Sequence, residues 1–240
     1  MIRTGLIVST PFECAGVLTA ITHKQIRSIA EVNFISGRLS AKNRDEPVTI
    51  CISGVGKTNA ARAATLLIEH YRPARLILFG VGGAYPSSDL GIGDIVVADR
   101  ESYGDEGLRM NNGFRDMADL GLPLFLSRGK TFHNSFPLSV PKKLRQRCRA
   151  GGFVTVSACT GTLAEGLRME RRWSAVCENM EGAAVAHIGR AHGVVLTEIR
   201  SISNIIEDRS GAPLNKADLQ QAASAMQHFF LDAWRKNVFS

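Results

Sequence analysis

VTICISGVGKTNAARAATLLIEHYRPARLILFGVGG (48–83) is the stretch that decides the fold. VTICIS (48–53) is a short apolar run rich in β-branched residues, which predicts a buried strand. TNAARAATLLIEHYR (58–72) combines good helix formers with an apolar stripe, and RPARLILFGVGG (72–83) predicts a strand that runs into glycines. A strand, a helix and a strand in this order favour a parallel sheet that is covered on both faces.

The same kinds of signal continue on both sides of this unit. Apolar runs predict further buried strands at 4–10, 91–99, 153–158 and 194–204. Helical patterns lie at 141–150, 181–193 and 214–236. Residues 26–40 suggest a more exposed hairpin, and Gly193 is placed to be the C-cap of the helix before it. Residues 100–137 suggest a long irregular excursion. Because no linker, repeat or low-complexity tract divides the chain, we expect one domain, 1–240.

The composition is that of a globular protein, with 45% hydrophobic and 21% charged residues. Disorder, collagen and coiled coil are therefore excluded as descriptions of the whole chain. No apolar run approaches the roughly 20 residues of a membrane span, and MIRTGLIVSTPFE (1–13) is too short for a signal peptide. We expect a cytoplasmic protein without a membrane partner. The five cysteines include no CxxC pair, which disfavours zinc fingers and disulfide scaffolds.

The net charge of +7 is unevenly distributed. Residues 1–120 carry 13 basic and 13 acidic side chains, whereas residues 121–240 carry 16 and 9. Much of the excess lies in PKKLRQRCR (141–149), and basic runs of this kind can attract nucleic acid or anionic small molecules. Aromatic residues make up only 7% of the chain and none interrupts the run. We interpret the run as a solvated helix face and expect no nucleic-acid partner.

Several nucleotide and metal motifs are incomplete. GVGKT (54–58) resembles the end of a P-loop, but that motif needs a glycine at position 51, where the chain has cysteine. A dinucleotide fingerprint fails because Asn59 takes the place of its third small residue. HExxH is absent, and no cluster of His, Asp and Glu has the spacing of a metal site. We therefore expect neither a metal nor a cofactor.

Polar or glycine-rich segments follow several of the predicted strands. They are STPFE (9–13), GVGGAY (80–85), SACTGT (157–162) and SISN (201–204). A fifth segment, ENMEG (178–182), opens a predicted helix with a carboxylate. In an open α/β sheet, ligands bind beyond the carboxyl ends of the strands. Five such segments in one domain predict a pocket at this edge.

The order of these segments carries a resemblance to a known family. An early Glu loop precedes SGVGK, GVGGAY, GIGDIVVAD (91–99), MEGAAVAHI (180–188) and a strand that ends in R-x-I-S-N. Over almost its whole length the chain resembles the purine nucleoside phosphorylase and nucleosidase superfamily. YGDEG (103–107), MEGAAVAHI and ISN most resemble the futalosine hydrolases, with the methylthioadenosine/adenosylhomocysteine nucleosidases as the nearest sister family. The resemblance implies a three-layer α/β/α sandwich with a mixed central β-sheet.

The resemblance also implies an activity. Futalosine hydrolases cleave the N-glycosidic bond of futalosine in menaquinone biosynthesis, without a cofactor, and release hypoxanthine and dehypoxanthine futalosine. The family further implies a homodimer or a higher homo-oligomer that binds a small-molecule nucleoside. The alternatives are a methylthioadenosine/adenosylhomocysteine or aminodeoxyfutalosine nucleosidase, a purine nucleoside phosphorylase, and a non-enzymatic module that binds nucleosides or nucleic acid.

Two carboxylates match catalytic positions of the family. Glu13 would be the base that activates water, and because STPFEC carries no nearby arginine to attract phosphate, hydrolysis is favoured over phosphorolysis. Glu181 would accept hydrogen bonds from both ribose hydroxyls, with Met180 packed on the sugar. Asn179 stands where the sister nucleosidases have a carboxylate and is also expected to contact the substrate. For both carboxylates the alternative is a residue that merely lies at a helix N-terminus.

Asn204 discriminates between the candidate substrates. Adenine-specific sisters place Asp at this position, whereas an amide can donate to O6 and accept from a protonated N7. Asn204 therefore points to hypoxanthine or guanine, with an ordinary turn asparagine as the alternative. Close contacts to the substrate are also expected from two glycine-containing loops, at Val81, Gly82, Gly83, Gly161 and Thr162.

The benzoate of futalosine requires a positively charged partner. The irregular excursion 100–137 offers cations for this role, and the sequence does not choose between them. The candidates are Arg109, Arg115, Arg128 and Lys130.

Overall fold

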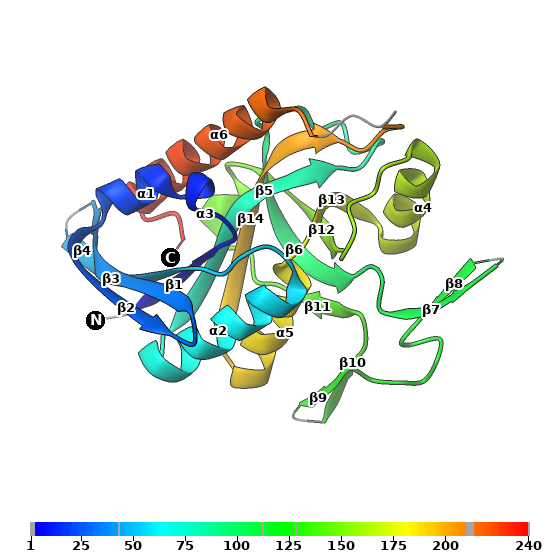
Figure 1. The fold of residues 1–240 in the computed structure, drawn as a ribbon, viewed down its shortest axis with the longest axis horizontal. Coiled ribbons are helices and arrows are strands. Elements are labelled where there is room, and N and C mark those ends of the chain that lie inside the picture. The colour runs from blue at the N-terminus through cyan, green and yellow to red at the C-terminus, as the bar shows by residue number, and fades with distance from the viewer. Residues whose placement is uncertain (1–2, 43, 112, 128, 210–213, 240) are drawn as a thin grey trace.

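Strand β5 lies at the centre of a mixed sheet (Figure 1). The computed structural model describes residues 3–42, 44–111, 113–127, 129–209 and 214–239. Within these ranges, ten strands join in this sheet. They are β1 (Thr4–Val8), β2 (Thr22–Ile29), β3 (Val32–Ala41), β4 (Arg44–Ile52), β5 (Arg75–Ala84), β6 (Ile95–Tyr103), β11 (Ser135–Pro137), β12 (Arg149–Thr155), β13 (Ala175–Asn179) and β14 (Val195–Ile205).

The predicted β-α-β unit is confirmed at the centre of the sheet. Strand β1 pairs in parallel with β4 on one side and with β5 on the other, and β14 is also parallel to β5. Helix α2 (Lys57–Tyr71) connects β4 to β5. Residues 76–79 of β5 are completely buried, because helices cover both faces of this part of the sheet.

Antiparallel pairs make the sheet mixed, as expected. Strands β2, β3 and β4 form an antiparallel meander at one edge, which contains the predicted hairpin. Beyond β5, β13 runs antiparallel to β5, and β14 runs antiparallel to β6. Because β12 pairs with both β6 and β13, the strands β5, β14, β6, β12 and β13 close into a ring. The sheet therefore curves back on itself beside the central strands.

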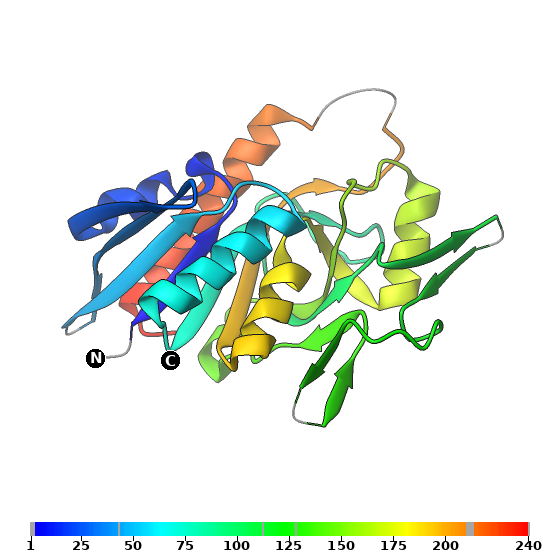
Figure 2. The same cartoon turned by 60° about the horizontal axis from the view of Figure 1, so that its bottom comes forward.

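Helices cover the two faces of the sheet and confirm the three-layer arrangement. Helices α1 (Ala15–Ala20) and α6 (Lys216–Arg235) lie on one face, and α2 and α5 (Gly182–His192) lie on the other (Figures 1 and 2). Four consecutive small residues of α5, 183–186, are buried. Gly193 ends α5 with a φ of 69°, the left-handed conformation expected of its C-cap.

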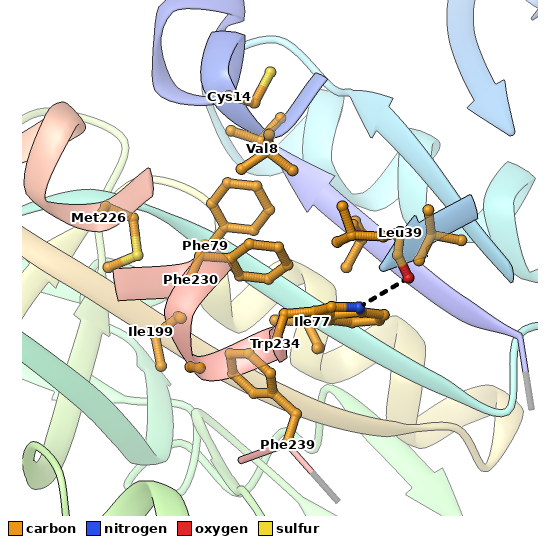
Figure 3. Packing of buried hydrophobic residues seen from close by; sticks show 14 of the residues in the cluster. Val8, Cys14, Leu39, Ile77, Phe79, Ile199, Met226, Phe230, Trp234 and Phe239 are labelled. Carbon is orange, nitrogen blue, oxygen red and sulfur yellow. Dashed lines mark hydrogen bonds between the residues drawn. The ribbon is translucent and has the colours of Figure 1, made fainter. Parts of the chain in front are cut away.

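The core under α6 contains a group of stacked aromatic rings among aliphatic side chains (Figure 3). Phe79 of β5 stacks on Phe230 of α6 with ring centroids 4.5 Å apart. Trp234, one helical turn further, buries its ring and donates its indole N–H to the carbonyl oxygen of Leu39 at 3.3 Å. The predicted amphipathic C-terminal helix is thus fixed to the sheet by its apolar stripe and by one polar contact.

Several elements differ from the prediction. Helix α4 (Leu163–Trp173) and strand β13 were not predicted, and the helix predicted at 141–150 is only the short α3 (Lys142–Arg145), because β12 begins at Arg149. The excursion contains two small hairpins in addition to β11. Their strands are β7 (Gly107–Met110), β8 (Gly113–Asp116), β9 (Phe125–Ser127) and β10 (Lys130–Phe132). Across the described ranges, the helices lack the combination of length and apolar character that a membrane span requires.

Candidate active site

A cavity of about 220 Å³ lies where the segments after β1, β5, β13 and β14 meet. The predicted convergence of strand ends therefore produces a pocket. Most of the residues that the sequence singled out line this cavity. They are Glu13, Val81, Gly82, Gly83, Asn179, Met180, Glu181 and Asn204.

Glu13 ends the short 3₁₀ turn η1 (Pro11–Glu13) that follows β1. Its Oε2 accepts hydrogen bonds from the backbone N–H and the hydroxyl of Thr10, at 2.9 and 2.6 Å. Its Oε1 accepts the backbone N–H of Val81 at 2.9 Å, so the side chain bridges the β1 and β5 loops. Burial raises the pKa of Glu13, although these hydrogen bonds oppose the shift. The carboxylate therefore caps its own turn and also faces the cavity.

Glu181 occupies the N-cap position of α5, but its side chain makes no capping hydrogen bond there. Instead, Oε1 accepts the backbone N–H of Gly56 at 3.0 Å, and Oε2 lies 3.3 Å from Nη1 of Arg200. Gly56 has a φ of 96°, a conformation that favours glycine, so the SGVGK loop can turn its N–H toward the carboxylate. The SGVGK segment thus contributes to the site through its backbone.

Arg200 is the main functional candidate that sequence reasoning missed. It lies within β14 with 1% of its surface exposed, and its Nε donates to Glu198 at 2.9 Å. Its Nη1 donates to the carbonyl oxygen of Val81 at 3.1 Å and also reaches Glu181. Burial lowers the pKa of Arg200, but the neighbouring carboxylates have the larger effect and raise it overall. Arg200 therefore stays a cation. The available signal was a pair of charged residues, Glu198 and Arg200, inside a strand that is mostly buried.

The position of Arg200 corrects one sequence argument. We expected no arginine near Glu13, because STPFEC contains none. The structure brings Arg200 from β14 into the same cavity, close enough to lower the pKa of Glu13 in opposition to burial. A local sequence window cannot show this proximity, since 187 positions separate the two residues along the chain.

The buried side chain of Asn179 binds the backbone at the start of α5. Its Oδ1 accepts the backbone N–H groups of Glu181 and Gly182 at 2.9 and 2.7 Å. Its Nδ2 donates to the fully buried Glu101 at 2.5 Å. An amide suits this place because it accepts from two backbone groups and donates to a carboxylate at the same time. The side chain therefore positions Glu181.

Asn204 lies near the end of β14, half-buried and directly opposite Gly83 of β5. The register of β14 shifts between Ile202 and Asn204, and such irregularities re-aim side chains. The Ser203 hydroxyl lies 3.1 Å from Oδ1 of Asn204 and can donate to it. A Cβ at position 83 would lie only 2.9 Å from Nδ2 of Asn204, so glycine is needed where the two strands bring the amide close.

Two predicted contacts are not part of the cavity lining. Thr162 is the N-cap of α4, where its hydroxyl accepts the backbone N–H of Glu165 at 3.3 Å. The carbonyl oxygen of Gly161 accepts the backbone N–H of Arg209 at 3.1 Å. In place of these two residues, the strand and loop beside them contribute Glu178, Cys159 and Arg209 to the lining.

The proposed benzoate partners are also not found at the cavity. Arg109 and Arg115 belong to the β7–β8 hairpin, and neither lines the cavity. Lys130 lines a different cavity of about 430 Å³, and Arg128 lies outside the described residues. Over the part of the chain that the structure describes, no three His, Cys, Asp or Glu side chains are grouped so that they could hold a metal ion.

Comparisons with known proteins identify related chains. Futalosine hydrolase of Thermus thermophilus is 34% identical over 157 residues, which is 63% of this chain and 67% of that protein. The methylthioadenosine/adenosylhomocysteine nucleosidase of Shewanella oneidensis is 31% identical over 84% of both chains.

Solved structures share the fold. A futalosine hydrolase structure from Helicobacter pylori has a TM-score of 0.78 at 18% identity and covers 95% of both chains. An adenine complex of the Colwellia psychrerythraea nucleosidase has a TM-score of 0.77 at 23% identity, over 96% of this chain and 93% of that one. The family model for the phosphorylase superfamily matches residues 3–234. This chain therefore belongs to the phosphorylase superfamily.

Proposed function

We propose that this chain is an N-glycosyl hydrolase that cleaves futalosine to hypoxanthine and dehypoxanthine futalosine, a step of menaquinone biosynthesis. The observation that carries the proposal is the convergence of Glu13, Glu181, Arg200 and Asn204 on one cavity. The two carboxylates suit a sugar that becomes cationic, Arg200 holds Glu181 in place, and an amide suits a 6-oxopurine. We call Glu13, Glu181 and Arg200 the sugar end, and Asn204 with its neighbour Glu178 the base end.

Glu13 would act as the general base toward water. A base works best when its pKa lies near the operating pH, and burial shifts the pKa of Glu13 in that direction. Thr10 and Val81 hold both carboxylate oxygens, so the group needs no reorientation before it accepts a proton. Such positioning lowers the cost of organising the transition state.

Glu181 would bind the ribose hydroxyls and stabilise the positive charge that develops on the sugar. A carboxylate has acceptor sites for about four hydrogen bonds, and Gly56 and Arg200 occupy only part of this capacity. Because the sugar is most cationic at the transition state, the interaction strengthens there and contributes to rate.

Hydrolysis remains the better proposal despite the arginine in the cavity. The guanidinium of Arg200 already bonds Glu198, Glu181 and the carbonyl of Val81. Its charge is therefore balanced by carboxylates, and Glu13 and Glu178 add further negative charge to the cavity wall. This negative charge would repel a phosphate anion, whereas it would not repel a neutral water molecule.

A methylthioadenosine/adenosylhomocysteine nucleosidase is the second candidate. It is supported by the relative from Shewanella oneidensis, which matches a larger share of this chain than the futalosine hydrolase relative does. The two candidates share the sugar end and differ in the purine and in the group at the 5′ carbon. Asn204 favours the 6-oxopurine, because an amide lacks the acidic proton that an Asp can supply to adenine N7.

The purified protein incubated with futalosine, inosine and methylthioadenosine, each with and without phosphate, tests the proposal. We expect hypoxanthine from futalosine at a rate that phosphate does not change. Release of adenine from methylthioadenosine at a higher rate would instead establish the second candidate, and dependence on phosphate would establish a phosphorylase. The homo-oligomer that the family implies is tested by light scattering on the same preparation.

A further inference from the structure

Three neighbouring strands place one glycine between two polar side chains. Glu178 of β13 is the direct partner of Gly83 in β5, and Asn204 of β14 is the partner of the same glycine on the other side. Adjacent strands lie about 4.8 Å apart, so the two backbones flank Gly83 at roughly 10 Å from each other. Glu178, Gly83 and Asn204 all line the cavity. A flat base lying over the glycine can therefore reach both side chains with its edge.

Glu178 is a carboxylate with spare acceptor capacity. It is 5% exposed, and its Oε1 accepts the backbone N–H of Thr160 at 2.8 Å. Its Oε2 accepts the Thr160 hydroxyl and lies 3.4 Å from the hydroxyl of Tyr85. Since a carboxylate offers about four acceptor sites, an acceptor site on Oε1 remains for a ligand.

The surroundings of Glu178 combine burial with compensating donors. Burial raises its pKa, whereas the contacts from Thr160 and Tyr85 and the nearby cation of Arg209 lower it. Cys159 and Arg209 lie beside it in the cavity wall, and the sugar-end carboxylates line the same cavity. Burying a carboxylate is costly unless donors compensate it, and here the pKa stays raised although Thr160, Tyr85 and Arg209 oppose the shift, so a further donor from a ligand would be favourable. None of the steps assigned to the sugar end requires Glu178.

We propose that Glu178 is a specificity-determining residue that accepts a hydrogen bond from N1–H of a 6-oxopurine, while Asn204 contacts the O6 and N7 side. This inference rests on the proposed function. A 6-oxopurine presents a donor at N1 and an acceptor at O6. A 6-aminopurine presents the opposite pair, an acceptor at N1 and a donor at its amino group. A carboxylate that faces N1 therefore attracts the first base and repels the second.

Glu178→Gln tests the inference because it keeps the shape and removes the charge. The amide can accept from N1–H through oxygen or donate to an unprotonated N1 through nitrogen. The measurement is kcat/KM for futalosine and for aminodeoxyfutalosine, which carries adenine. We expect the ratio of kcat/KM for futalosine to kcat/KM for aminodeoxyfutalosine to fall about tenfold or more. The matched control is Glu69→Gln on α2, whose side chain is 61% exposed, and its ratio should equal that of the wild type.

The outcomes separate the inference from the function on which it rests. If the wild type prefers the 6-oxo substrate and Glu178→Gln leaves the ratio within twofold, the inference is wrong while the proposed function stands. If the wild type prefers the 6-amino substrate, both are overturned. A second measurement needs no variant: competitive inhibition of the wild type by hypoxanthine and by 1-methylhypoxanthine, which lacks the N1–H. We expect the methylated base to bind at least tenfold more weakly, and equal binding would contradict the inference.

Discussion

The sugar end and the base end of the cavity are built differently. At the sugar end, Glu13, Glu181 and Arg200 are almost fully buried, and each is held by backbone groups from another segment. At the base end, Glu178 is also buried and held by the backbone N–H of Thr160. Asn204, however, is half-buried, and a side-chain hydroxyl, that of Ser203, is the contact on its amide oxygen. Charge that must stabilise a transition state is fixed rigidly, whereas selection between bases depends on a few donors and acceptors. Changes at the first end should alter rate for every substrate, and changes at the second should alter preference.

The largest effect is expected for Glu13→Gln, which keeps the shape of the side chain and removes the base. Positioned general bases contribute roughly 10²–10⁴-fold, so turnover should fall by about 10² or more. The loss should be equal for futalosine and aminodeoxyfutalosine, while substrate binding, measured by calorimetry, should survive. Turnover near the wild-type value would remove Glu13 from the mechanism.

The pH dependence of kcat/KM supplies a second readout on the same residue. Glu13 must be ionised to accept a proton, so activity is lost as the pH falls through its folded-state pKa. Burial raises that pKa above the ordinary value of a glutamate, and the acid limb of the profile should therefore lie above the ordinary value too. An acid limb that persists unchanged in the residual activity of Glu13→Gln would assign it to another group.

The next largest effect is expected for Glu181→Gln, which should lower both kcat and kcat/KM for both substrates by about tenfold or more. The reason is that the contact with the ribose exists in the ground state and strengthens as the sugar becomes cationic. A 2′-deoxy substrate, which lacks one hydroxyl donor, should be a poor substrate for the wild type and lose less on mutation. Equal reaction of the deoxy and ribo substrates would contradict the ribose-binding role.

At both ends, the sequence predicted some of the residues and missed others. Glu13 and Asn204 follow or end predicted strands and Glu181 opens a predicted helix, and the rule that ligands bind at the carboxyl ends of the strands was enough to bring them together. The central strands and α2, α5 and α6 were predicted for the same reason, since long apolar or amphipathic runs dominate local preference. The family resemblance then supplied roles that no local pattern contains.

Arg200 and Glu178 show where sequence reasoning stopped. Both belong to buried strands, and which face their side chains occupy depends on sheet register, which a single sequence does not reveal. Thr162 shows a role that the sequence did not reveal, because its hydroxyl is the N-cap of α4, a helix of mostly polar residues with a weak apolar signal. The basic side chains of the excursion were considered as partners of the benzoate because a sequence shows which residues are charged. It does not show how far they lie from the cavity.

Asn204→Asp tests whether the base end selects between 6-oxopurine and 6-aminopurine substrates. An Asp can supply a proton to adenine N7 but loses the amide donor to O6, so activity on futalosine should fall and activity on aminodeoxyfutalosine should rise. Leaving one buried donor or acceptor unpaired costs roughly 1–3 kcal/mol, which corresponds to about one to two decades in the specificity ratio. Kinetics of both proteins on both substrates measure the ratio. A wild type that prefers the adenine substrate would overturn the 6-oxopurine interpretation.

Ser203→Ala should have the smallest effect and separates orientation from direct contact. The Ser203 hydroxyl lies 3.1 Å from Oδ1 of Asn204 and itself has 5% of its surface exposed, so it can hold the amide in one of its two orientations. A net hydrogen bond contributes about 1 kcal/mol, so loss of this contact should reduce the preference for futalosine about fivefold. The rate on futalosine should fall by no more than that factor, since the sugar end is untouched. A fall in rate as large as that of Glu13→Gln would show that the two ends are not independent, because a residue of the base end would then control the chemistry of the sugar.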